Sequence, residues 1–282
     1  MTTMLETSRP LKWIENRPSH GWRPRIDFRE LWSYRDLARF LAVRDLKLRY
    51  KQTAIGIGWV VLQPLIAAGI FTGIFGHVAK VPSQGLPYPV FVLAGLAVWQ
   101  YAGTGVREVA ESLVTDRDLV TKTYFPRLLA PIGALLPGLV DLGVAIAIVA
   151  IAMIIASVGP GLELLTLPAW ILAAVLMVFG VGIWLAGLNV LYRDVRYTLT
   201  FMVQIWIYAS PVAYPSSLVH GTWRWVYSLN PAVGVVDGFR WSLVGTPAPP
   251  VQDLLSLASI VVLIFTGVVY FRRVERQFAD RI

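Results

Sequence analysis

Long apolar segments separated by short charged stretches form the main pattern along this chain. A transmembrane helix needs about 20 largely apolar residues to cross a hydrocarbon core of about 30 Å. Backbone groups inside a bilayer must bond within such a helix, so we expect an all-α, polytopic membrane protein. Six segments fit this pattern, the fifth of them short: Ala54–Gly76, Tyr88–Val106, Leu128–Ala156, Pro168–Leu191, Thr198–Ala213 and Leu254–Phe271.

Residues 214–245, between the fifth and sixth segments, are harder to assign. The part Trp223–Val244 is apolar enough for a seventh span, but Pro231 and several charged residues interrupt it. Because a charge at bilayer depth costs a few kcal/mol, we expect a broken, interfacial or re-entrant helix on the outer side. Candidate residues of this outer segment, two of them with rings suited to the headgroup level, are Trp223, Trp225, Asn230 and Arg240.

Basic residues fall almost entirely on one side of these six spans. Twelve precede Ala54, four lie within 107–127, two within 192–197 and four after Phe271, so 22 of the 25 Lys and Arg residues share a side. The positive-inside rule then places both termini in the cytoplasm, and a seventh span would move the Arg-rich tail outside. This distribution accounts for the net charge of +8, and we therefore expect no nucleic-acid partner.

The composition agrees with a membrane protein. Hydrophobic residues make up 56% of the chain and charged residues 15%, against about 45–50% and 25% in a soluble domain. The chain contains no cysteine, which excludes disulfides and thiolate metal sites. Residues 1–53 lack an apolar core of about 7–15 residues, so we expect the first span itself to direct membrane insertion.

An amphipathic helix is predicted over Glu30–Tyr50, directly before the first span. Leu31, Tyr34, Leu37, Ala38, Leu41 and Ala42 recur at helical spacing and form one apolar stripe. Beyond Ala42 the stripe is interrupted by Asp45 and Arg49. Such an Arg-rich helix is typical of the membrane interface, and the alternative is a solvated flank without a further role.

The loop of residues 107–127 carries charges of both signs and ends in Tyr124-Phe125-Pro126, a pattern that predicts a short helix ended by proline. Such a helix can dock a soluble partner, although a simple connecting loop is the alternative. The same loop contains Asp116-Arg117-Asp118. Paired carboxylates of this kind can hold a divalent ion that carries a sugar nucleotide, so a membrane glycosyltransferase stays open as an alternative.

Other catalytic motifs are absent from the sequence. It contains no G-x-x-x-x-G-K-[ST], H-E-x-x-H or G-x-S-x-G pattern, which are the signatures of a phosphate-binding loop, a zinc protease and a nucleophile elbow. Its three histidines, His20, His77 and His220, are far apart in sequence and do not suggest a metal site.

Polar and aromatic side chains inside the predicted spans are the remaining candidates. Asp141 is the only acidic residue within a span. An intramembrane carboxylate marks either a functional site or a bond to another helix, and because no second ionisable group lies in the spans we favour a structural role over proton coupling. Aromatic rings stack on sugars or serve helix packing, and those within or beside the spans include Trp99, Tyr101, Trp184, Trp206 and Tyr208.

Four sequence blocks carry a specific resemblance. They are Arg44–Gly56 (RDLKLRYKQTAIG) with Trp59 and Leu62-Gln63-Pro64 after it, Leu119–Arg127 (LVTKTYFPR), Leu188–Val195 (LNVLYRDV) and Leu229-Asn230-Pro231. With these blocks the sequence, over roughly residues 28–275, resembles the permease subunits of ATP-binding-cassette (ABC) exporters for O-antigen, teichoic acid and capsular polysaccharides.

This resemblance implies an architecture and a set of partners. It implies a six-span homodimer in the bacterial cytoplasmic (inner) membrane, with the channel between protomers. Two copies of a separate ATPase subunit would bind ATP and Mg²⁺, so this chain would need no cofactor or metal of its own and would not be an enzyme. The chain would divide into an N-terminal extension with the interface helix (1–53), a permease domain (54–272) and a cytoplasmic tail (273–282).

The resemblance also assigns roles to individual segments. The interface helix would use Tyr34, Arg35, Arg39, Arg44, Arg49 and Tyr50. A coupling helix seated in the ATPase would include Glu111, Asp116, Arg117, Asp118, Lys122, Tyr124 and Phe125. The channel would be lined by Trp59, Gln63, Trp99, Tyr101, Trp184, Trp206 and Tyr208. The segment 214–245 would form two short re-entrant helices at the exit. We therefore expect export of a lipid-linked polysaccharide, with a drug or lipid permease of the same superfamily as a further alternative.

Overall fold

The structure is a computed structural model of the whole chain and describes residues 28–51, 57–117, 125–192, 194–275 and 278. Over these residues every regular element is helical and no strand occurs. The elements in order are α1 (Phe28–Ser33), α2 (Arg35–Lys51), α3 (Ile57–Phe71), η1 (Thr72–Val78), α4 (Tyr88–Thr115), α6 (Leu129–Ile155), η2 (Leu162–Thr166), α7 (Leu167–Leu191), α8 (Asp194–Trp206), η3 (Ser216–Leu218), α9 (Thr222–Tyr227), α10 (Pro231–Val244), η4 (Val251–Asp253) and α11 (Leu254–Val274).

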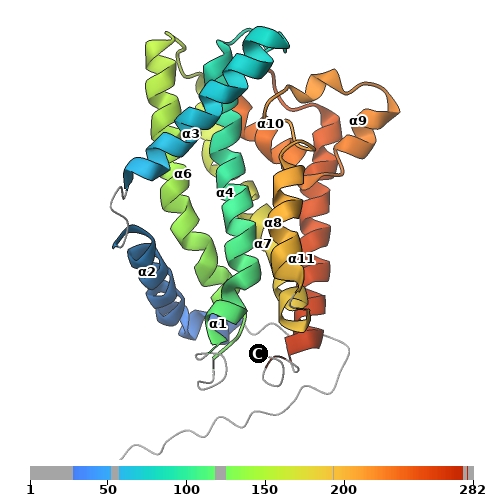
Figure 1. Cartoon of the computed structure of the whole chain (residues 1–282). Coiled ribbons are helices and arrows are strands. Elements are labelled where there is room, and N and C mark those ends of the chain that lie inside the picture. Colours follow the sequence, from blue (N-terminus) through green and yellow to red (C-terminus); the bar gives the residue numbers. More distant parts are fainter. Residues whose placement is uncertain (1–27, 52–56, 118–124, 193, 276–277, 279–282) are drawn as a thin grey trace, which may run out of the picture.

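Five helices of the described chain are long and apolar enough to cross a membrane. Figure 1 shows these long helices running side by side. We call the end of the bundle that holds α9 and the start of α4 the outer end, and the end where α11 finishes the inner end. The five helices coincide with five of the six predicted spans and cover Gly58–Val78, Tyr88–Thr115, Leu129–Ile155, Leu162–Leu191 and Val251–Val274.

The predicted fifth span, Thr198–Ala213, differs from the other five. Its helix, α8, has only 13 residues, and the chain continues from it through turns to Ala213. Thirteen residues rise about 20 Å, roughly two thirds of a hydrocarbon core of about 30 Å. Pro211 disfavours a helical conformation at Ser210, and the chain between Trp206 and Pro211 forms turns.

The chain from Arg196 to Ala213 nevertheless runs from one end of α4 to the other. At the inner end Arg196 pairs with Glu111, with a nitrogen–oxygen distance of 3.3 Å. At the outer end the Tyr88 hydroxyl donates a hydrogen bond of 2.6 Å to the carbonyl of Ala213. The stretch of α4 between Tyr88 and Glu111 is about 35 Å long at a rise of 1.5 Å per residue. A segment that is only partly helical therefore covers a distance of membrane thickness.

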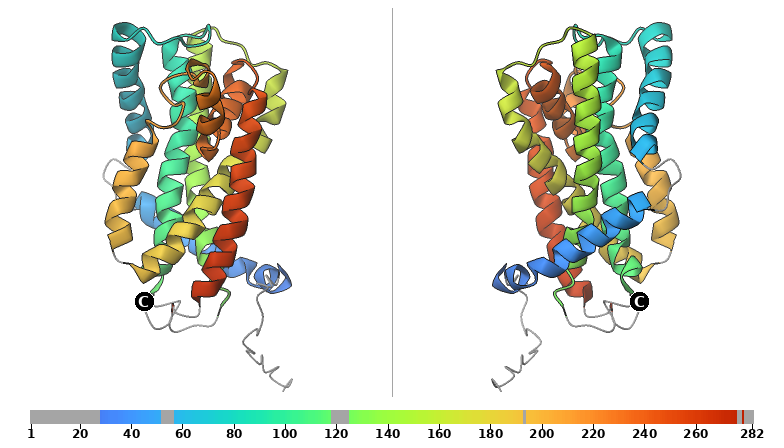
Figure 2. Two further views of the ribbon diagram at one scale, coloured as in Figure 1. Left: turned by 90° about the vertical axis from the view of Figure 1, so that its right-hand side faces the viewer. Right: turned by 90° about the vertical axis from the view of Figure 1, so that its left-hand side faces the viewer.

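Helix α4 is the centre of the bundle, whereas α3 is peripheral. Helix α4 packs against α3, α6, α7 and α10, and its side chains are mostly buried. Helix α3 leaves apolar side chains such as Leu62 and Ile66 exposed. Figure 2 shows α3 (teal) and α8 (orange) along one edge of the molecule, with α11 (red) on the other side. This edge is therefore an apolar surface that the protomer itself does not cover.

The N-terminal helix predicted over Glu30–Tyr50 is present as α1 and α2, which are separated at Tyr34. The apolar stripe does not face lipid: Ala38 and Leu41 are buried, and α2 packs along α6. The opposite face exposes Arg35 and Arg39 together with the large apolar side chains Trp32, Phe40, Val43 and Leu48. The N-terminal helix thus has two apolar surfaces. One packs against the bundle, and the other, which also carries arginines, is exposed.

The expected break in the outer segment lies between α9 and α10. Asn230 caps α10, because its side chain accepts a hydrogen bond of 3.0 Å from the backbone N–H of Ala232, and Pro231 occupies the first helical position. Both choices are typical of helix N-termini. Trp223 and Trp225 of α9 are exposed, whereas Arg240 of α10 is 1% exposed.

Gly238 allows α10 to approach α7 closely. A Cβ atom at this position would lie 2.3 Å from the ring of Trp170, a distance at which one of the helices must shift. We expect Gly238→Ala to lower the free energy of unfolding by about 1–3 kcal/mol, the usual cost of overpacking. The measurement is the thermal unfolding midpoint of the purified protein in detergent, followed by tryptophan fluorescence.

Gly143→Ala is the matched control for this prediction. A Cβ atom at Gly143, in α6, would meet no atom within 4 Å. Alanine is up to about 1 kcal/mol more favourable than glycine inside a helix, so the midpoint should stay unchanged or rise. Equal midpoints for Gly238→Ala and the unmodified chain would contradict the close approach.

Candidate functional site

Arg49, near the end of α2, lies between two carboxylates of the bundle. Its guanidinium pairs with Asp141 of α6 and with Glu108 of α4, and the hydroxyl of the adjacent Tyr50 donates to Asp141. The three charged side chains are 24–29% exposed. Asp141 lies about 18 Å along α6 from its inner end at a rise of 1.5 Å per residue. The Arg49 cluster, defined as Arg49, Tyr50, Glu108 and Asp141, is therefore deep in the bundle.

This cluster changes the interpretation of Asp141. The sequence offers no ionisable partner for it within the spans, but the structure brings Arg49 and Tyr50 to it from α2, a helix outside the spans. The physical reason is the course of α2, which rises along α6 (Figure 1) instead of staying at the end of the bundle. Burial, and then the hydrogen bond to Asp141, raise the pKa of Tyr50 to about 12. Tyr50 thus remains a protonated donor at neutral pH.

A second set of charges joins α2 to the end of α4. The guanidinium of Arg44 lies 2.7 Å from a carboxylate oxygen of Asp116 and bonds Asp45 at 2.8 Å. Asp116 is 7% exposed, and this burial raises its pKa although Arg44 opposes the shift. The interruption of the apolar stripe after Ala42 therefore has an explanation: Arg44 and Arg49 pair with carboxylates of α6 and of the α4 region, and Asp45 pairs with Arg44.

The other predicted coupling residues are placed as follows. Glu111 pairs with Arg196 of α8, Arg117 is exposed, and Phe125 is buried in an apolar cluster with Leu128 and Phe271. Asp118, Lys122 and Tyr124 lie outside the described residues, as do residues 1–27. Within the described part the loop is thus attached to three helices, α2, α8 and α11.

Of the two aspartates in the Asp116-Arg117-Asp118 pattern, the structure describes Asp116, and the surroundings of Asp116 do not support a metal site. Asp116 is neutralised by Arg44, whereas a divalent cation prefers carboxylates that are free to coordinate it. Among the described residues there is no group of three or more His, Cys, Asp or Glu side chains placed to hold a metal ion.

The seven predicted channel residues fall into two environments. Trp99 and Tyr101 are buried in α4, and Trp184 stacks on Tyr270 of α11 with ring centroids 4.6 Å apart. Trp59 and Tyr208 are 53% and 68% exposed. Gln63 is also exposed. Trp206 lies between the groups, with its ring edge-on to Trp99 at 5.3 Å. The three exposed residues, on the edge formed by α3 and α8, are the most accessible of the seven from outside this protomer.

Two polar side chains hold the outer segment to the end of α8. The Asn230 amide accepts a hydrogen bond from the indole N–H of Trp206 at 2.9 Å and donates to the carbonyl of Ala209 at 2.8 Å. The buried Arg240 guanidinium donates to the carbonyls of Pro211 and Val212 at 2.9 and 3.0 Å and lies over the ring of Phe91. Backbone carbonyls that have no helical hydrogen-bond donor beyond the end of α8 thereby accept hydrogen bonds from side chains.

With this geometry established, the sequence can be compared with known proteins. Residues 37–244 match the family model described as ABC-2 type transporter. The chain belongs to the ABC-2 type transporter family. It is thus a multi-pass membrane subunit of a transporter rather than an enzyme, and family membership implies an ATPase partner. The resemblance drawn from its four sequence blocks is confirmed.

Relatives of this ABC-2 chain match it over nearly its whole length. The O-antigen export system permease protein RfbA of Myxococcus xanthus is 26% identical over 258 residues, which cover 90% of this chain and 98% of that protein. Two proteins of the same name from Klebsiella pneumoniae are 26% and 24% identical, each over 87% of this chain and 94% of its own length. The Arg49 cluster, the Asp116 pair and Asn230 all lie within residues 37–244, the part that matches the family model.

The Arg49 cluster of the ABC-2 chain predicts an asymmetry between two substitutions. Arg49→Ala leaves two carboxylates without their cation, and breaking a buried pair in this way costs about 3–5 kcal/mol, here about 3 because the groups are partly exposed. Asp141→Asn keeps the Arg49–Glu108 pair and an oxygen acceptor for Tyr50, so its cost should be about 1 kcal/mol.

Thermal unfolding in detergent measures both effects. The double variant Arg49→Ala/Asp141→Asn should recover part of the loss caused by Arg49→Ala, because one unpaired charge has been removed. Equal losses for the two single variants, with no recovery in the double variant, would show that the cluster does not stabilise the bundle.

Proposed function

We propose that this chain is the channel-forming permease of an ABC exporter that moves a lipid-linked polysaccharide of the O-antigen type across the bacterial inner membrane. The observation that carries the proposal is the near-complete match to O-antigen export permeases, over 87–90% of this chain, in addition to the family match. Two copies of a partner ATPase would supply ATP and Mg²⁺ chemistry.

The proposal includes six membrane crossings with both termini in the cytoplasm. The segment 196–213 makes the fifth crossing as a short helix followed by turns, and its contacts at both ends of α4 support this course. The charges agree, because Lys80, Arg224 and Arg240 are the only basic residues that six crossings place outside, and both arginines are buried and paired.

A homodimer with the channel along the α3–α8 edge fits the surface of the protomer. This edge exposes the amide groups of Gln63 and Gln204 among apolar side chains. An amide exposed to lipid without a partner costs several kcal/mol, so a second protomer or a water-filled channel is the more favourable neighbour. Trp59 and Tyr208 would offer stacking faces to the polysaccharide there.

The ion pairs of α2 support a mechanism of rigid-body coupling. When the ATPase closes on ATP, the loop 107–127 would move as a unit with α4. The Arg44–Asp116 pair would carry that motion to α2, and the Arg49 cluster would carry it to α6. The interface helix thereby becomes a connection between the ATPase side and the spans that flank the channel.

The absence of native cysteine makes the dimer testable by cross-linking. We expect Trp59→Cys and Tyr208→Cys to form covalent dimers with a short bifunctional thiol reagent in native membranes, detected on non-reducing gels. Phe265→Cys is the control, because Phe265 is 70% exposed but lies on α11, away from the proposed interface (Figure 2). Dimers from Phe265→Cys alone would place the interface elsewhere.

The export function is tested in cells that lack the native permease gene. The unmodified chain should restore surface polysaccharide, and combined alanine substitutions at Asp118, Lys122 and Tyr124 should abolish export and co-purification of the ATPase. Alanine at the exposed outer residues Leu162 and Leu165 serves as the control. Full export after the coupling-loop changes would contradict the mechanism, and turnover of a sugar nucleotide by the purified chain alone would favour the glycosyltransferase alternative.

A further inference from the structure

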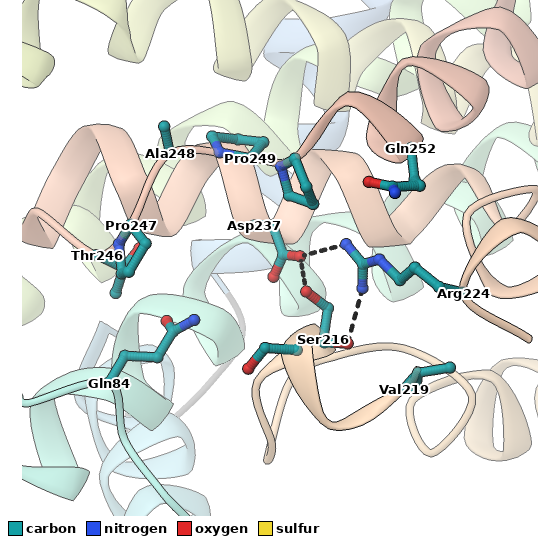
Figure 3. A pocket seen from close by; sticks show the side chains of 12 residues that line it. Gln84, Ser216, Val219, Arg224, Asp237, Thr246, Pro247, Ala248, Pro249 and Gln252 are labelled. Atoms are coloured by element: carbon teal, nitrogen blue, oxygen red, sulfur yellow. Dashed lines mark hydrogen bonds and ion pairs between the residues drawn. The ribbon is translucent and has the colours of Figure 1, made fainter. Parts of the chain in front are cut away.

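A pocket of about 300 Å³ with both polar and apolar lining residues lies at the outer end of the bundle. Three loops and the flank of α10 form it: the turn before α4, the segment after α8 and the proline-rich link between α10 and α11. Figure 3 shows the side chains converging from these elements. The residues that line the pocket include Gln84, Ser217, Arg224, Asp237 and Gln252.

The charged groups of this outer pocket neutralise one another. The guanidinium of Arg224 donates to Asp253 at 2.6 Å and to the carbonyl of Ser216 at 2.8 Å, and lies 3.5 Å from Asp237. Asp237 also accepts a hydrogen bond from the Ser216 hydroxyl and lies 3.7 Å from Arg240. With two arginines opposite two aspartates, the site has no excess charge to attract an anion or a cation.

Gln84 is held over the pocket by an unusual backbone conformation. Its φ of +57° is uncommon for a residue with a side chain, and it is followed by Gly85 with φ of +85° in a turn closed by a hydrogen bond from Leu86 to Ser83. Glycine or asparagine would suit Gln84's position better. A glutamine kept there at a conformational cost points to a use for its amide.

Two amides of the pocket are available to a ligand. The side chains of Gln84 and Gln252 make no hydrogen bond to other described residues, and both are partly exposed. Each amide presents two donor hydrogens beside an acceptor oxygen, which suits neighbouring hydroxyl groups that both donate and accept. Ser217 adds a hydroxyl, and Pro247, Pro249 and Pro250 add apolar ring faces.

We propose that this pocket binds one or two uncharged sugar units of the exported chain after they leave the channel. The proposal rests on the proposed function for the substrate class, but the neutral charge, the unpaired amides and the hydroxyl come from the pocket itself. A volume of about 300 Å³ is at the small end for ligand sites and suits a short stretch of a polymer. The pyrophosphate of a lipid carrier is disfavoured, because Arg224 is already paired with carboxylates.

Saturation-transfer NMR on the full-length chain in lipid nanodiscs tests the proposal directly. The probes are free glucose, galactose, mannose, rhamnose and maltose, with glucose 1-phosphate as the charged counterpart. We expect binding of at least one neutral sugar, and Gln84→Gly and Gln252→Ala should weaken it by about two- to tenfold, the range for losing one hydrogen bond. His220→Ala, at an exposed outer residue that does not line the pocket, should bind as the unmodified chain does.

The choice of glycine at position 84 separates binding from folding. Glycine accepts a positive φ without strain, so Gln84→Gly should unfold at the same temperature as the unmodified chain or higher. Gln84→Asn keeps an amide in a backbone conformation that asparagine tolerates and should retain part of the binding. Equal binding by all variants, tighter binding of glucose 1-phosphate, or no binding of any neutral sugar would overturn the proposal.

Export in cells distinguishes failure of the pocket from failure of the proposed function. If the unmodified chain restores surface polysaccharide while the pocket variants bind sugars unchanged, the pocket proposal is wrong and the exporter stands. If the unmodified chain restores none in the presence of its ATPase, the exporter function is wrong, whatever the pocket binds.

Discussion

The pairing of buried and partly buried charges joins separate segments of this permease. Arg49 faces Asp141 and Glu108 deep in the bundle, and at the outer end Arg224 bonds Asp253 across 29 positions in the sequence. Removing one member of such a pair leaves an uncompensated charge, which costs far more than an exposed ion pair contributes. Helices that are not covalent neighbours therefore keep fixed positions relative to one another. Burial of apolar surface stabilises the packing of the helices, and the ion pairs favour the arrangement in which each charge meets its partner.

These pairs also divide the molecule into a well-connected body and a less connected edge. Helices α2, α4, α6, α7, α10 and α11 share extensive packing, and the Arg49 cluster joins three of them, α2, α4 and α6. Helix α3 contacts mainly α4 and α6, and α8 contacts mainly α4 and α7, with large apolar side chains exposed on both. An edge of this kind is complete only when another surface covers it. This division would suit the channel between protomers that we propose, since the edge would change its neighbours while the body stays intact.

Sequence reasoning predicted the long helices well, because length and apolarity alone specify a span. It also expected a broken helix within Trp223–Val244, and of the interruptions that it noted, the structure has the break at Asn230 and Pro231. It could not give the length of α8, which depends on side chains from α10 that complete the turns after it. The partner of Asp141 was missed because Arg49 lies outside the spans, although the interrupted stripe after Ala42 was a signal that those polar residues face protein. Trp184 illustrates the remaining difficulty: whether a ring faces a channel or stacks on Tyr270 depends on helix rotation, which one sequence does not specify.

The end of α8 has a consequence for how the chain is made. The carbonyls of Pro211 and Val212 receive their hydrogen bonds from Arg240, a residue synthesised 29 and 28 positions later. When the segment is first synthesised, these two acceptors, which lie in the turns after the end of α8 at Trp206, do not yet have Arg240 as their donor. In the six-crossing topology that we propose, this segment would therefore reach its final form only after α10 has packed against it. A ribosome stalled between the two segments would leave the proposed fifth crossing unfinished.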